Sequence, residues 1–190
     1  MANPCPTPLG NRVLMTLIAD PVNVGGIQLG GRRELPKRGK VLALGTSGEF
    51  PLSVGDEVIF EWFECMKLPD RDENNLNYYT ISVPNIQIII PMNDPQKLIV
   101  TGDRVLVLVD EPITKEQGGI LLPETLNPRP TDATVVAVGP GINSKEGHII
   151  PLKLNAGDRC IISRQAGVDT MVNGIKHKII EAKDILVVLK

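Results

Sequence analysis

The side chains that most often carry out chemistry in proteins are few and scattered in this chain of 190 residues. Three cysteines, Cys5, Cys65 and Cys160, are far apart and odd in number, which fits neither a zinc-ligand spacing nor a disulfide framework. The two histidines, His148 and His177, stand in polar stretches, and we expect both to be solvated. Because the sequence offers no paired acid and base and no nucleophile constellation, it predicts neither a metal site nor an enzyme.

Recognition by apolar side chains is the chemistry that the stretch EQGGILLPE, residues 116–124, favours. A glycine pair there precedes three large aliphatic residues in a polar, proline-flanked segment. One interpretation is a β-hairpin that turns at the glycines and folds its aliphatic side chains onto a core. The other is an exposed loop that presents these side chains to a partner. Residues 114–117 show no apolar alternation to pair with the aliphatics, and sequence physics alone leaves both interpretations open.

The elements that must position this stretch are predicted to be strands. Hydrophobic residues make up 42% of the chain but aromatic residues only 3%, so the core must be built from Val, Ile and Leu. The β-branched residues are prominent among these, which favours strands. The chain also contains 18 Gly and 16 Pro, which favour frequent turns and disfavour long helices. We therefore predict an all-β fold.

Charge and targeting signals exclude several classes of partner. The net charge of −2 shows no footprint of a nucleic-acid binder. No apolar run approaches the roughly 18 residues that a membrane-spanning helix needs. The first ten residues lack the basic and apolar regions of a signal peptide and the Arg and Ser of a transit sequence. We expect a cytoplasmic protein without nucleic-acid or membrane partners.

The chain contains an internal duplication, because five blocks recur in the same order at offsets between 92 and 102 residues. We predict two domains, residues 1–95 and 96–190, each a small barrel or sandwich of short strands. The paired blocks are GNRVLMTLI (10–18) with GDRVLVLVD (102–110), GGIQL (25–29) with GGILL (118–122), KVLALG (40–45) with TVVAVG (134–139), VGDEVIF (54–60) with AGDRCII (156–162), and NIQIII (85–90) with DILVVL (184–189).

In both copies the glycine pair lies in a long irregular segment, residues 19–37 and 111–131. Segments of this length inside compact domains are usually functional or disordered. The order of motifs (G-D-R-V-L, G-G-I-L-L, V-V-A-V-G-P-G, A-G-D and D-I-L-V-V-L) resembles the GroES-type co-chaperonin family, also called chaperonin-10. The tandem arrangement resembles the double-domain co-chaperonins of chloroplasts. The resemblance implies two tandem GroES-like small β-barrels, each with a long mobile loop.

The resemblance also implies a function. Such a co-chaperonin forms a ring or dome, caps a GroEL-type chaperonin ring and assists ATP-dependent protein folding, with ATP bound by the chaperonin and no cofactor of its own. An aliphatic tripeptide in each mobile loop docks into a hydrophobic groove of the chaperonin, and the glycine pair before it forms the turn. On this chain the chaperonin-binding residues are Ile27, Gln28, Leu29, Ile120, Leu121 and Leu122, and the turn residues are Gly25, Gly26, Gly118 and Gly119.

Three positions bear on how closely the chain follows the family. Gln28 places an amide where the family has an aliphatic residue. The segment 45–54 is too short for the hairpin that roofs the family's dome, whereas 139–154 is full length. Phe63 matches an aromatic that faces the chamber in relatives, with core or interface packing as an equal alternative; the second copy has Gln165. These departures keep an alternative function open: a GroES-like β-barrel scaffold or interaction protein that no longer binds a chaperonin.

Assembly in the family pairs the first strand of one barrel with the last strand of its neighbour. Here the first strands are expected at residues 12–17 and 104–109, and the last strands at 86–90 and 185–189. We therefore expect a homo-oligomer.

We predict that residues 19–37 and 111–131 are poorly ordered without a partner and become ordered on binding, because they are rich in Gly and Pro and lack a paired strand pattern. Hydrogen exchange should show fast amides in both segments of the chain alone and slower amides in a chaperonin complex. Strong protection in the chain alone would support the hairpin interpretation instead.

Overall fold

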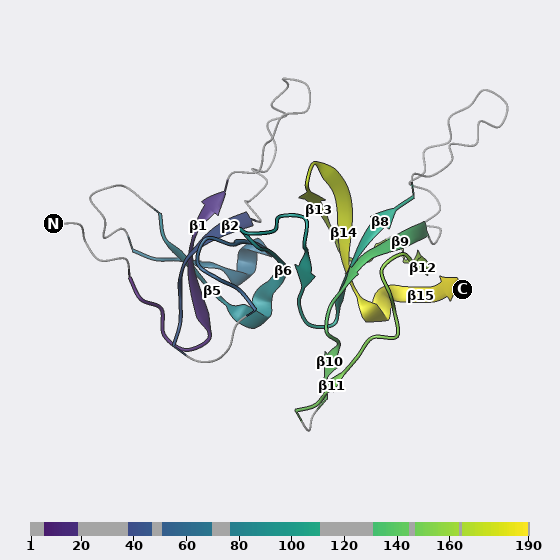
Figure 1. Cartoon of the computed structure of the whole chain (residues 1–190), viewed down its shortest axis with the longest axis horizontal. Helices are drawn as coiled ribbons and strands as arrows, with labels where there is room; N and C mark the ends of the chain where they lie inside the picture. Colours follow the sequence, from purple (N-terminus) through teal and green to yellow (C-terminus); the bar gives the residue numbers. More distant parts are fainter. Residues whose placement is uncertain are drawn as a thin grey trace, which may run out of the picture. The chain divides into compact units, whose positions relative to one another are not determined.

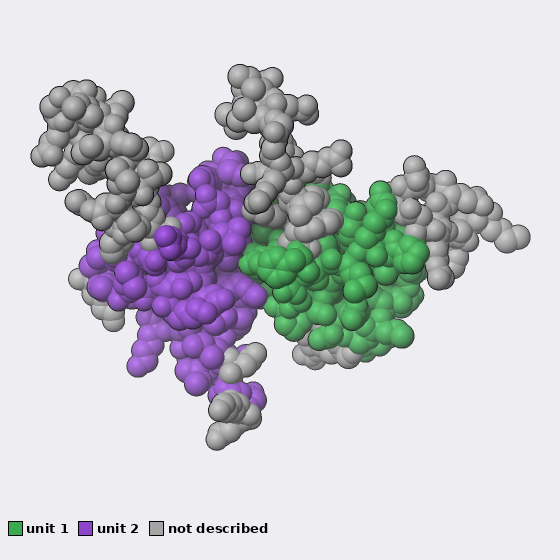
Figure 2. Space-filling model, turned by 180° about the vertical axis from the view of Figure 1, so that it is seen from behind, with its two compact units in different colours: residues 1–99 green, residues 100–190 purple. Residues whose placement is uncertain are grey.

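A computed structural model describes residues 6–18, 38–46, 51–69, 77–110, 131–144, 147–163 and 165–189. Backbone contacts divide the chain into two compact units, Met1–Ile99 and Val100–Lys190, which are coloured separately in Figure 2. The duplication in the sequence predicts this boundary at residue 95. Each unit is described by itself below.

The first unit is organised by one seven-stranded sheet with the order β4-β5-β1-β2-β3-β6-β7. Figure 1 labels β1, β2, β5 and β6 of this sheet. From β4 to β6 the neighbouring strands are antiparallel. Short 3-10 turns, η1 (Trp62–Glu64) and η2 (Val83–Asn85), follow β3 and β5. The strands are β1 (Arg12–Ile18), β2 (Arg38–Leu44), β3 (Glu57–Phe60), β4 (Met66–Lys67), β5 (Tyr79–Ser82), β6 (Ile86–Ile90) and β7 (Ile99–Val100). The boundary between the units falls within β7, so Val100 is counted in the second unit.

The second unit repeats this scheme in a six-stranded antiparallel sheet with the order β13-β14-β8-β9-β12-β15. A separate two-stranded hairpin, β10/β11, follows β9, and the 3-10 turn η4 (Ala182–Asp184) precedes β15. The strands are β8 (Arg104–Val109), β9 (Thr131–Val138), β10 (Ile142–Asn143), β11 (Ile149–Ile150), β12 (Arg159–Ile162), β13 (Val168–Val172), β14 (Ile175–Glu181) and β15 (Ile185–Leu189).

The two sheets confirm the predicted fold class, an all-β chain of two tandem small barrels. Apart from β7, which has no counterpart in the second sheet, the two sheets have the same strand order, and the described residues contain 3-10 turns but no α-helix. None of the helical turns in these residues is long and apolar enough to cross a membrane.

Aliphatic side chains build both cores, as the composition predicted. In each barrel, alternate residues of the central strands point inward, which follows from the two-residue period of a strand. Phe60 is the one aromatic among the fully buried core residues that the structure describes. The first core includes Val13, Met15, Val41, Val58, Phe60, Ile81, Ile86 and Ile89. The second includes Val105, Val107, Ala133, Val135, Cys160, Ile162 and Ile180.

A close backbone contact explains why the same glycines recur in both copies. In the second barrel, Gly139 donates its N–H to the carbonyl oxygen of Arg104 at 2.9 Å, and a Cβ on Gly139 would lie 2.3 Å from the carbonyl oxygen of Gly102. In the first barrel, a Cβ on Gly45 would lie 2.1 Å from the carbonyl oxygen of Gly10. No side chain fits where these backbones cross. The backbone just before the first strand therefore requires glycine at the end of the second strand.

The Gly-Asp turns of both copies also share one geometry. The Asp56 carboxylate accepts the N–H of Ser53 at 2.7 Å, and the Asp158 carboxylate accepts the N–H of Asn155 at 2.9 Å. The preceding glycines have φ values of +98° and +95°, which favour glycine. These turns direct the chain into β3 and β12.

We predict that Gly139→Ala destabilises the second barrel by about 1–3 kcal/mol, because the added methyl group overlaps backbone atoms that cannot move away independently. Urea unfolding followed by circular dichroism measures the loss. Val136→Thr, a nearly isosteric change at a half-buried position of the same strand, is the control. Equal stability of the alanine variant and the unaltered chain would contradict this account of the repeated glycines.

Candidate functional site

The predicted chaperonin-binding residues lie outside the described residues. This holds for both tripeptides, Ile27–Leu29 and Ile120–Leu122, and for the glycine pairs before them. Their roles, and the choice between hairpin and recognition loop, therefore stay predictions. The structure does describe the strands that each long segment joins, β1 and β2 in the first barrel and β8 and β9 in the second. We call the ends of these strand pairs next to the long segments the stems.

Both stems are pairs of adjacent antiparallel strands. Ile18 at the end of β1 lies opposite Arg38 at the start of β2. In the second barrel Val109 lies opposite Ala133, and the Asp110 N–H donates to the carbonyl oxygen of Asp132 at 2.9 Å. Thr131 already belongs to β9, so the second segment ends one residue earlier than predicted. In each barrel, therefore, the segment that carries the aliphatic motif leaves and returns at neighbouring points.

The structure corrects one part of the expected assembly. The strands expected to pair with a neighbouring barrel, β1 and β8, have both edges occupied: β1 lies between β5 and β2, and β8 lies between β14 and β9. Neither can accept a further strand. The prediction for the first strands is wrong, because each repeat's first strand is a central strand of its sheet.

The last strands, β6 and β15, differ in what covers them. Both pair with the third strand of their barrel in the same register, with the bulge at the same place. Beyond β6 lies β7, and all five β6 residues are buried. Among the described residues β15 has a neighbour on one side only, and its Leu186, Val187 and Leu189 are between 44% and 55% exposed. An unpaired, apolar strand edge favours addition of another strand.

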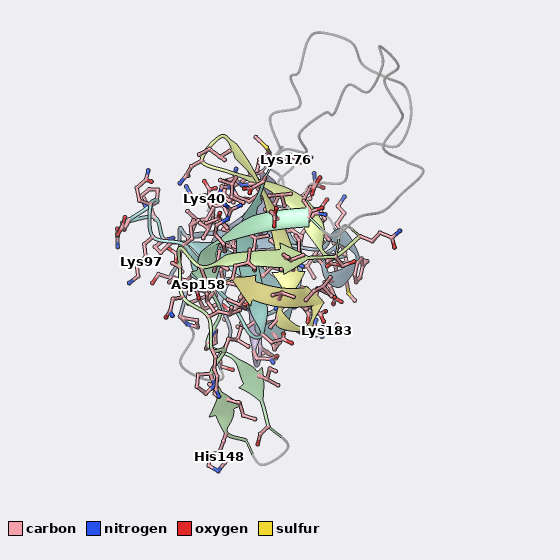
Figure 3. The ribbon with its side chains drawn as sticks, turned by 90° about the vertical axis from the view of Figure 1, so that its right-hand side faces the viewer. Lys40, Lys97, His148, Asp158, Lys176 and Lys183 are labelled. Carbon is pink, nitrogen blue, oxygen red and sulfur yellow. The ribbon has the colours of Figure 1, made fainter. Side chains whose placement is uncertain are left out.

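The hairpin β10/β11 presents a second apolar surface. It lies within residues 139–154, the stretch assigned to the roof, and pairs Ile142 with Ile150. Both side chains are exposed, as is Ile149. Figure 3 shows the hairpin projecting from the sheet with His148 near its tip. Ile142 and Ile150 lie opposite each other on one face of the hairpin, and Ile149 faces the other side, because successive residues of a strand point to opposite faces.

Phe63 is 75% exposed in the turn η1, so it takes no part in the core of its own barrel. Of the two alternatives that the sequence left open, core packing is therefore excluded. Contact with a neighbouring chain or exposure to a chamber both remain consistent with this position.

His177 corrects an expectation about solvation. It is only 8% exposed, and its Nδ1 lies 2.9 Å from the carbonyl oxygen of Ile175. The polar sequence around it is misleading, because β14 lies between β13 and β8 and alternate residues of the strand face inward. His148 is exposed, as expected.

The thiols and acidic groups form no reactive centre in the part of the chain that is described. Burial raises the pKa of both Cys65 and Cys160, and the charges of Asp132 and Asp158 raise that of Cys160 further. Both thiols are therefore poor nucleophiles at neutral pH. No group of three or more His, Cys, Asp or Glu among the described residues could hold a metal ion.

Two barrels of one design, each with a long segment between its first two strands, define a tandem small-barrel protein. Residues 97–189 match the family model described as the chaperonin 10 kDa subunit. The chain is 31% identical over 192 residues to the chloroplastic 20 kDa chaperonin of Spinacia oleracea, an alignment that covers 96% of this chain and 74% of that protein. The corresponding Arabidopsis thaliana protein is also 31% identical, with 96% and 75% covered.

Single-domain relatives match about half of the chain. The co-chaperonin GroES of Methylacidiphilum infernorum is 37% identical over 89 residues, which cover 47% of this chain and 90% of that protein. The chain thus belongs to the chaperonin 10 kDa family, in its tandem two-domain form.

Proposed function

We propose that this chain is a co-chaperonin that caps a GroEL-type chaperonin ring and assists ATP-dependent protein folding. The observation that carries the proposal is the match of 96% of the chain to two-domain chaperonins. Two barrels of one strand order support it, since each joins a motif-bearing segment to a paired stem. ATP is bound by the chaperonin in this proposal, and the chain itself contributes binding rather than catalysis.

Magnitudes indicate why one loop does not suffice. Burying a Leu or Ile side chain is worth about 1.5–3 kcal/mol, so three give roughly 4–9 kcal/mol. Ordering about six loop residues costs roughly 6–12 kcal/mol of backbone entropy. A single loop is therefore near break-even. Several loops on one assembly make each later contact intramolecular, which yields useful affinity while each contact stays weak enough to release.

A second candidate function, a barrel scaffold that no longer binds a chaperonin, is favoured by two features of the first copy. Gln28 interrupts its aliphatic tripeptide, and the segment 45–54 is shorter than its counterpart 139–154. Both features affect one barrel only. The second barrel retains a complete motif, so we favour the co-chaperonin.

We predict that the second loop dominates chaperonin binding. An aliphatic groove accepts Leu121, whereas Gln28 must keep its amide in water or bury it unpaired at about 1–3 kcal/mol. Leu121→Gln should therefore abolish or severely weaken association with a GroEL-type chaperonin in interferometry, and Gln28→Leu should strengthen it.

Gln28→Ser is the matched control and should change the affinity little. If it weakens binding as much as Leu121→Gln does, Gln28 makes a specific hydrogen bond and the first loop is not the weaker one. If Leu121→Gln binds as well as the unaltered chain, the second loop does not dominate binding. If the unaltered chain itself does not bind, the scaffold function is the better account.

We further propose that the assembly forms by strand addition at β15. The offset of the first repeated block places Thr7 and Pro8 at the positions of Ile99 and Val100, which form β7. Residues 6–9 have no regular secondary structure, and Leu9 is exposed. In our proposal this segment of a second copy adds to the open edge of β15 in the way that β7 adds to β6.

The prolines determine which edge of the segment pairs. Successive N–H groups of a strand point to opposite edges, so Thr7 and Leu9 donate on one side while Pro6 and Pro8 occupy the other. Proline lacks an N–H and is tolerated on the outer side of an edge strand. Thr7 and Leu9 therefore face β15, and the prolines prevent a further strand from adding.

We predict that Thr7→Pro weakens self-association by about 0.5–1.5 kcal/mol per contact, because it removes one donor. Pro8→Thr adds a donor on the outer side and should change self-association little. Sedimentation velocity of the full chain measures both. A strictly monomeric chain would contradict the proposed assembly. Self-association that becomes stronger in Pro8→Thr would contradict this orientation of the segment.

A further inference from the structure

An arginine–carboxylate pair joins each stem to the third strand of its barrel. In the first barrel Arg38, the first residue of β2, pairs with Glu57 of β3. In the second barrel Asp110, the residue after β8, pairs with Arg159 of β12, whose Nη2 lies 2.5 Å from Oδ2 of Asp110. Both pairs lie where the long segment enters or leaves the barrel.

The strand registers show that the charged residue on the third strand occupies the same position in both barrels but carries the opposite charge. Glu57 lies opposite Lys40 on β2, and Arg159 lies opposite Thr134 on β9. Two residues nearer the stem, Ile59 lies opposite Arg38 and Ile161 lies opposite Asp132. Glu57 therefore corresponds to Arg159.

The same registers align the stem residues. Arg38 corresponds to Asp132, and Ile18, which lies opposite Arg38, corresponds to Asp110. The third strand carries the acid and the stem the base in the first barrel, and the reverse holds in the second. Both barrels therefore have an electrostatic attraction between the stem and the third strand. None of the paired residues is identical to its counterpart in the other barrel.

We propose that these pairs are positioning devices for the loops: each holds the stem against the third strand and thereby fixes where the loop leaves the barrel. This proposal rests on the proposed function, because the loops are the chaperonin-binding segments there. Arg159 reaches past β9 to Asp110 on the far side, so its pair ties three strands together at the stem. A stem fixed in this way reduces the loop conformations that must be lost on docking.

Exposure predicts that the two pairs differ in strength. The side chains of Arg38 and Glu57 are 21% and 37% exposed, and those of Arg159 and Asp110 are 56% and 43% exposed. Solvent and salt screen the second pair more strongly. The second pair should therefore have a modest effect that weakens as salt is added.

The test uses the first barrel as the template for rescue. Arg159→Glu alone gives the second barrel the acid of β3 while its stem keeps Asp110 and Asp132, so attraction becomes repulsion. The triple variant Asp110→Ile, Asp132→Arg, Arg159→Glu transplants the complete arrangement of Ile18, Arg38 and Glu57. Lys183→Glu is the control, since it changes the net charge by the same −2 as Arg159→Glu.

Lys183 suits this purpose because it lies at the other end of the barrel. It follows Glu181, which pairs with Arg104 at the start of β8, whereas Asp110 follows the end of that strand. Lys183 pairs with Glu181, so the control also breaks an exposed ion pair.

Two measurements on the full chain separate the pair's role from that of the loop. Hydrogen exchange reports on the stem through the amide of residue 110, which donates to the carbonyl oxygen of Asp132. Its rate is compared after division by the intrinsic rate for each variant's own sequence. Interferometry reports association with a GroEL-type chaperonin in ATP. At low salt, Arg159→Glu should make exchange of the amide of residue 110 about two- to five-fold faster. It should weaken the affinity for the chaperonin by about the same factor. The triple variant should restore both to within about two-fold of the unaltered chain, and Lys183→Glu should change neither.

Unchanged exchange in Arg159→Glu, or failure of the triple variant to restore it, would overturn the hold on the stem. Faster exchange without weaker association would overturn the positioning role. If the unaltered chain does not bind a chaperonin, the proposed function fails and the positioning role with it. The exchange results still decide whether the pair holds the stem.

Discussion

The edge of a β-sheet is the constraint on which this structure depends. Backbone N–H and C=O groups that are left unpaired along a strand invite another strand, and an apolar edge does so more strongly. In the first barrel β7 covers the last strand, and that strand is entirely buried. In the second barrel no strand among the described residues covers the same edge, and its apolar side chains are half exposed. An oligomer that completes this edge would also bring several weak loops together, which the energetics of a single loop require.

The duplication provides a controlled comparison within one chain. What both copies keep is backbone geometry: the glycine crossing at Gly45 and Gly139, the carboxylate turn before the third strand, and the bulge in the pairing of the last strand. What differs are charged residues of the stems and two stretches of sequence. The charges of the stem residues are reversed, and one aliphatic tripeptide contains Gln28. In residues 6–9, which precede the first strand, every second residue is proline. A closely packed backbone limits substitution inside the barrel, while the surface is free to make the two barrels unequal.

The sequence alone predicted the fold well because its signals are local or repeated. Short β-branched runs, Gly-Asp turns and an offset near 92 residues were enough to predict two barrels and their strands. It failed where long-range pairing decides. β7 belongs to none of the repeated blocks, so the sequence does not predict the strand that covers β6, and the pairing that it predicts for β1 is excluded by the position of β1 in the sheet. His177 was read as solvated since its neighbours are lysines. A comparison of the two copies by residue identity does not reveal the ion pairs of the stems, because positions with reversed charge count as mismatches.

Native mass spectrometry of this chain mixed with a GroEL-type chaperonin and ATP tests the central claim most directly. The account predicts one dominant complex in which several copies of the chain are bound to a chaperonin ring, since one loop alone is near break-even. Spectra that show only separate chaperonin and chain at every concentration tested would contradict it. A complex with a single copy per ring would contradict the multivalent cap and retain only the family membership.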